Sequence, residues 1–72
     1  MVDGMNQIEF AQKTGKYTLI GIKGSIPNEW NCKTVLIDGL LYDAAPVYDL
    51  QNHFSVVGEG ISVGQMVEFP LI

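Results

Sequence analysis

Two short runs of β-prone residues are separated only by Asp38-Gly39, the strongest hairpin signal in the chain. A two-residue type I′ turn requires a positive φ at both central positions, and the Asp-Gly pair tolerates this conformation well. With these two residues at the turn, residues 34–37 pair with residues 40–43. Side chains that lie directly opposite each other share a face of the sheet. We therefore expect a core face of Val35, Ile37, Leu40 and Tyr42, and an opposite face of Thr34, Leu36, Leu41 and Asp43.

The length of 72 residues predicts a single small domain over residues 1–72. A chain this short buries only about 60% of the surface that its unfolded form exposes. The sequence is 47% hydrophobic and only 17% charged, and its single cysteine, Cys32, excludes an internal disulfide. We expect a homo-oligomer, because association buries apolar surface that the chain is too short to cover by itself.

Further strands are predicted on both sides of the hairpin. Residues 17–23 and 53–57 are rich in β-branched and aromatic residues, and residues 65–71 alternate apolar with other side chains. Glycine-rich turns separate these segments, and no long helical pattern is present. The fold class is therefore predicted to be all-β, as a small antiparallel meander or barrel of five to six short strands.

Residues 6–14 fit two structures. Asn6 and Glu9 have the spacing of a helical capping box, which would make the fold α+β. Ile8 and Phe10 alternate with polar residues, as in a strand that continues through a glycine turn into the next one. We favour the strand.

The apolar positions of the predicted strands define a core, and Trp30 is expected to close one end of it. Gly21, inside a predicted strand, indicates a bulge or a close backbone approach. The predicted core residues are Leu19, Trp30, Val35, Ile37, Leu40, Tyr42, Val67 and Phe69.

Charge is divided unevenly along the chain. The net charge is −4, all four basic residues are lysines within the first 33 positions, and there is no arginine. Direct binding of nucleic acid is therefore not expected, since it depends on clustered lysine and arginine. Three carboxylates, Asp38, Asp43 and Asp49, lie along the central hairpin and its continuation. They predict an acidic strip that could attract a protein partner with a basic surface.

Enzymatic chemistry has few candidate residues. Cys32, Asp49 and His53 could form a nucleophile, an orienting carboxylate and a base for a small hydrolase or transferase, if the fold brings them together. No paired cysteine or histidine spacing suggests a metal, and nothing suggests a cofactor. The sequence therefore predicts no enzyme, no cofactor and no metal site.

The location and role follow from the same features. The first residues lack the basic and apolar parts of a secretory signal, and no apolar run approaches the roughly 20 residues of a membrane span, so we expect a cytoplasmic protein. The leading hypothesis is a non-enzymatic protein-interaction or regulatory module that self-associates. The alternative is an acidic inhibitor of a basic or nucleic-acid-binding partner. The predicted interaction surface consists of Leu36, Asp38, Leu41, Asp43 and Asp49.

Overall fold

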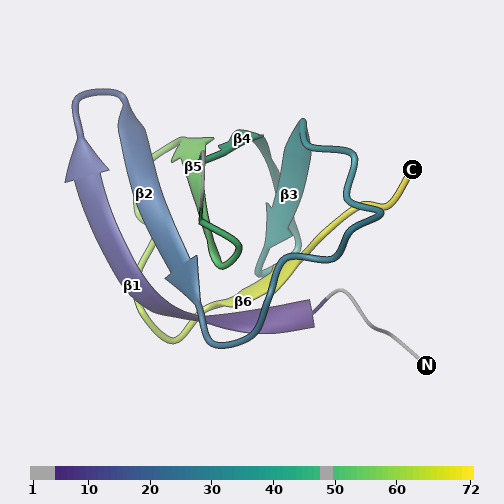
Figure 1. Ribbon diagram of the computed structural model, residues 1–72. Coiled ribbons are helices and arrows are strands. Elements are labelled where there is room, and N and C mark those ends of the chain that lie inside the picture. Colours follow the sequence, from purple (N-terminus) through teal and green to yellow (C-terminus); the bar gives the residue numbers. More distant parts are fainter. Residues whose placement is uncertain (1–4, 48–49) are drawn as a thin grey trace.

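Six antiparallel strands form a closed barrel in the computed structural model, which describes residues 5–47 and 50–72 (Figure 1). No helix occurs in these residues, so the all-β prediction is confirmed and the helical alternative for residues 6–14 is wrong. Neighbouring strands follow the order β1-β2-β5-β4-β3-β6, and β6 closes the barrel against β1. The strands are β1 (Met5–Thr14), β2 (Tyr17–Ile22), β3 (Thr34–Ile37), β4 (Leu40–Pro46), β5 (His53–Val57) and β6 (Met66–Glu68).

The central hairpin has the predicted turn and register. Asp38 and Gly39 have φ values of 50° and 85°, the positive pair that a type I′ turn requires. The paired residues run from Ile37 with Leu40 to Thr34 with Asp43, as the sequence indicates. Local turn chemistry therefore determines which side chains of β3 and β4 share a face.

A second hairpin joins β1 to β2. Its turn consists of Gly15 and Lys16, and Gly15 has a φ of 62°, which a residue without a Cβ adopts at little cost. The register shifts between Ile8 and Phe10, so Glu9 is the extra residue of a β-bulge. Residues 6–14 form a strand because β1 gains partners on both sides, from β2 and from β6.

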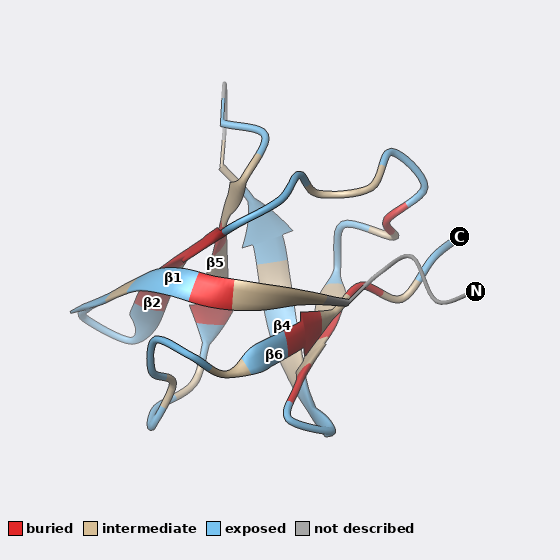
Figure 2. Ribbon diagram, turned by 90° about the horizontal axis from the view of Figure 1, so that it is seen from below, coloured by how far each residue is buried: buried red, intermediate tan, exposed pale blue. Residues whose placement is uncertain are grey.

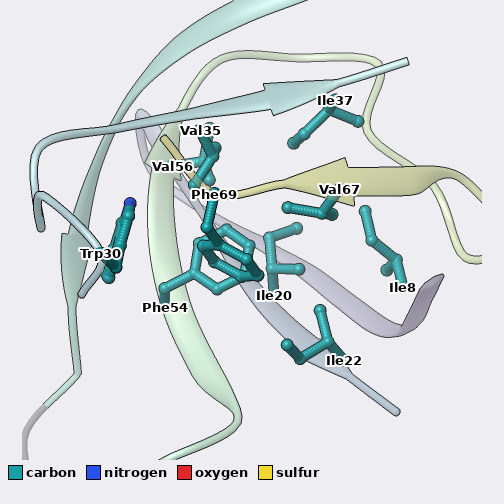
Figure 3. Packing of buried hydrophobic residues seen from close by; sticks show 10 residues of the cluster. All are labelled: Ile8, Ile20, Ile22, Trp30, Val35, Ile37, Phe54, Val56, Val67 and Phe69. Atoms are coloured by element: carbon teal, nitrogen blue, oxygen red, sulfur yellow. The ribbon is translucent and has the colours of Figure 1, made fainter. Parts of the chain in front are cut away.

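The barrel interior is filled by aliphatic side chains and three aromatic rings (Figure 3). The rings of Trp30, Phe54 and Phe69 pack edge to face, with centroids 5.3–6.0 Å apart. The Trp30 indole N–H donates to the carbonyl oxygen of Thr34 at 2.7 Å, so its one polar atom is satisfied. The buried core residues are Ile8, Ile20, Ile22, Trp30, Val35, Ile37, Phe54, Val56, Val67 and Phe69.

Three predicted core residues are not among those the barrel buries. Leu40 is 62% exposed, so its placement in the core is wrong. It lies opposite Ile37, but β5 pairs with β4 only from Asp43 onward, so the barrel wall has ended beside Leu40. Leu19 is half-buried on the outer face, because Thr18 and Ile20 point inward. Tyr42 is also half-buried and packs against the core.

None of the described residues forms a helix that is long and apolar enough to cross a membrane.

Candidate interaction surface

Four apolar side chains lie around the β3–β4 turn and the start of β6, with Leu36, Leu41 and Met66 on the outer face and Leu40 on the inner face, where the barrel wall has ended. Leu36 lies opposite Leu41 on the outer face of the hairpin, and Leu40 and Leu41 are 62% and 66% exposed. The neighbouring strand β6 adds Met66, which is 39% exposed. We call Leu36, Leu40, Leu41 and Met66 the tip surface. Figure 2 shows the turn of this hairpin as exposed.

Asp38 links the β3–β4 turn to the start of β6 by hydrogen bonds. One carboxylate oxygen accepts a hydrogen bond from the Met66 backbone N–H at 3.2 Å, and the other accepts from the Gln65 side-chain amide at 3.1 Å. The Asp38 backbone N–H in turn donates to the Met66 carbonyl oxygen at 3.0 Å. Asp38 therefore positions β6 beside the turn, and its carboxylate is already hydrogen-bonded.

The predicted acidic strip is placed only in part. Asp43 is exposed on the outer face of the sheet, between Thr34 of β3 and Val57 of β5. Asp38 lies at the turn, with the local hydrogen bonds given above. Asp49 falls outside the described residues. Of the predicted interaction residues, the hairpin register brings Leu36, Leu41 and Asp43 to one face.

The side chains of Cys32 and His53 contact different groups. Cys32 is exposed, has a φ of 62°, and its thiol contacts the Trp30 carbonyl oxygen at 3.5 Å. His53 Nδ1 is hydrogen-bonded to the Asn52 side-chain oxygen at 2.9 Å, and its ring packs near Phe10. None of these contacts joins the thiol to the imidazole, and Asp49 lies outside the residues that the structure places.

A pocket of about 550 Å³ opens beside Trp30. Its lining comes mainly from the β2–β3 connection, with Pro46, Leu50 and Gln51 on the other side. Cys32 is the only titratable side chain among these lining residues, so the described wall offers the thiol no base. Within residues 5–47 and 50–72, no three cysteine, histidine, aspartate or glutamate side chains are grouped to hold a metal ion.

The outer face carries one cluster that the sequence did not identify, formed by Gly21, Phe10 and His53. These residues lie on three adjacent strands, with Gly21 paired to both of the others. A Cβ added to Gly21 would lie 2.9 Å from His53 Nε2 and 3.1 Å from Phe10 Cβ. The glycine inside a predicted strand indicated a bulge or a close backbone approach; the bulge lies in the facing strand β1, and the groups that approach Gly21 are side-chain atoms of His53 and Phe10.

This contact predicts a coupled effect of two substitutions. Gly21→Ala should lower the free energy of unfolding by about 1–3 kcal/mol, because the new methyl group displaces the imidazole. In a His53→Ala background the same substitution should cost less, by at least about 0.5 kcal/mol. Urea denaturation of the four proteins of this cycle measures the coupling. Equal costs in both backgrounds would show that the imidazole is not the group in contact.

Comparison of this chain with models of protein families, with curated proteins and with solved structures found no match.

Proposed function

We propose that this chain is a non-enzymatic protein-interaction module that self-associates through the tip surface. The observation that carries the proposal is the pair of consecutive residues Leu40 and Leu41, each more than 60% exposed at the end of the β3–β4 hairpin, one on each of its faces. Large apolar side chains grouped on a surface favour contact with another protein, because association removes them from water.

The geometry of the tip surface supports a specific contact rather than non-specific hydrophobic association. The type I′ turn fixes the two leucines, and the Asp38 hydrogen bonds fix Met66 beside them. A pre-organised surface loses little conformational entropy on binding. Burial of each leucine side chain contributes about 1.5–3 kcal/mol, which is enough for a few residues per chain to determine association.

Sedimentation velocity of the native chain at micromolar concentrations tests this function. We expect a mass above the 7.9 kDa of one chain. The double substitution Leu40→Lys with Leu41→Lys should reduce association at least about tenfold, because it places charges in the buried contact. Far-UV circular dichroism should remain that of the native fold, since both residues are exposed.

Leu71→Lys provides the matched control. Leu71 is 52% exposed and lies in the isolated bridge with Trp30, away from the β3–β4 turn. This substitution should leave association unchanged. A native chain that sediments as one molecule at every concentration, or equal losses in the tip variant and the control, would overturn the proposal.

A further inference from the structure

A second group of exposed apolar side chains lies on the outer side of β1, β2 and β5. Tyr17, Val57 and Phe10 are 45%, 44% and 39% exposed. Tyr17 lies directly opposite Val57, and half-buried Leu19 lies two residues further along β2 on the same face. Phe10 reaches this face from β1, opposite Gly21. We call Phe10, Tyr17, Leu19 and Val57 the aromatic face.

Lysines lie at both ends of the aromatic face. The Lys16 ammonium is 5.6 Å from the centroid of the Tyr17 ring, close enough for a cation–π contact. Lys23 is exposed directly after β2, and it lies on the outer side because side chains alternate along a strand and Gly21 faces outward. The face therefore presents apolar rings and a leucine between two positive charges.

The tip surface is bordered by charges of the opposite sign. Glu68 lies beside Leu36 on the outer face, where β6 pairs with β3. The Asp38 carboxylate is exposed at the turn, and β3, β4, β6 and the β3–β4 turn contain no lysine. Asp43 is exposed between the two surfaces, next to Val57. An apolar surface bordered by carboxylates is complementary to an apolar surface bordered by lysines.

We propose that the tip surface of one copy of the chain binds the aromatic face of a second copy. The inference rests on the proposed function, because it names the surface that the tip contacts. Burial of the two apolar groups against each other removes both from water, and the charges around them attract. Contact between two tip surfaces would instead bring Asp38 and Glu68 of one copy close to the same carboxylates of the other, and like charges repel.

The two surfaces lie on opposite sides of the barrel. Two strands separate β2 from β3 in either direction around the barrel, and Figure 1 shows them on opposite sides. A chain therefore cannot present both surfaces to the same neighbour, and each contact leaves one tip surface and one aromatic face free. Association of this heterologous kind continues head to tail past two chains.

Two variants that each lose one surface test this pairing. The tip variant carries Leu40→Lys and Leu41→Lys, and the face variant carries Lys16→Glu and Tyr17→Glu. Both pairs of residues are exposed, so far-UV circular dichroism should remain native. In sedimentation velocity at about 100 μM, each variant alone should be a single chain, whereas the native chain should exceed the mass of two.

An equal mixture of the two variants is the decisive measurement. The tip variant retains its aromatic face, and the face variant retains its tip surface. The mixture should therefore form a complex of two chains and nothing larger, because the remaining two surfaces are blocked. A contact between identical surfaces cannot produce this result, since each variant would then associate by itself or not at all.

Single charge reversals test the electrostatic part. Lys23→Glu should weaken association of the native chain about fivefold, since it places a carboxylate opposite the acidic border of the tip surface. Lys33→Glu is the matched control, because it makes the same charge change at an exposed lysine outside both surfaces. It should leave association within about twofold of the native value. Equal effects of the two reversals would overturn the charge complementarity and with it the pairing.

The remaining outcomes separate this inference from the proposed function. A face variant that associates as strongly as the native chain, or a mixture that contains only single chains, overturns the pairing of the tip surface with the aromatic face. Association through the tip surface would still stand in either case. A native chain that sediments as one molecule at every concentration overturns the proposed function as well.

Discussion

Phe54→Ala should lower the free energy of unfolding by about 3–5 kcal/mol, because it removes a fully buried ring from the centre of the barrel. Phe54 packs edge to face against both Trp30 and Phe69, with centroids 6.0 and 5.3 Å away. The rigid barrel wall cannot collapse far into the resulting cavity. A domain of this size has a total stability of roughly 4–11 kcal/mol, so the variant should be partly or wholly unfolded at room temperature.

Thermal and urea denaturation followed by far-UV circular dichroism measure this loss. Val57→Ala on the same strand is the matched control, because Val57 is 44% exposed on the outer face. It should change stability by no more than about 1 kcal/mol. Comparable losses at the two positions would contradict the assignment of inner and outer faces along β5.

Trp30→Ala should cost a similar amount, about 3–5 kcal/mol, for two separable reasons. The substitution removes the indole from its contacts with Phe54 and Phe69, and it leaves the Thr34 carbonyl oxygen without the N–H donor that reaches it at 2.7 Å. Trp30→Phe keeps an aromatic ring but no donor. We therefore expect it to cost about 1–3 kcal/mol, with the hydrogen bond as the larger part.

Tyr17→Ala serves as the aromatic control for Trp30. Tyr17 is 45% exposed, so its loss should cost about 1 kcal/mol or less. Circular dichroism is the required probe, since the Trp30 variants lack the only tryptophan of the chain. If Trp30→Phe were as stable as the native protein, the hydrogen bond to Thr34 would contribute nothing measurable to the fold.

The sequence predicted the burial of Trp30 but not that of Phe54. Trp30 was expected to close one end of the core, because a large apolar side chain in a loop of a small domain has few other ways to leave water. Phe54 was not among the predicted core residues, although His53–Val57 was predicted as a strand. Its inward direction follows from the pairing of β5 with β2 and β4, both distant in sequence.

The tip surface shows the same division. Asp38-Gly39 was sufficient to predict that Leu36 and Leu41 share a face, because a two-residue turn fixes the register of the strands that it joins. The turn could not predict that Leu40 is exposed, because that depends on where β5 ends. Met66 joins the surface through the pairing of β6 with β3 and through its hydrogen bonds with Asp38, 28 residues away.

Interactions between residues close in the chain account for the features that were predicted correctly: the strands, the type I′ turn, the hairpin register and the all-β class. These depend on backbone conformation and on alternation within a few residues. Long-range packing sets which strands are neighbours, where the barrel wall ends at Leu40, and that β6 pairs with β1 no further than Gln7. Those features depend on pairing between residues as far apart as Met5 and Glu68, and no short stretch of sequence contains both partners.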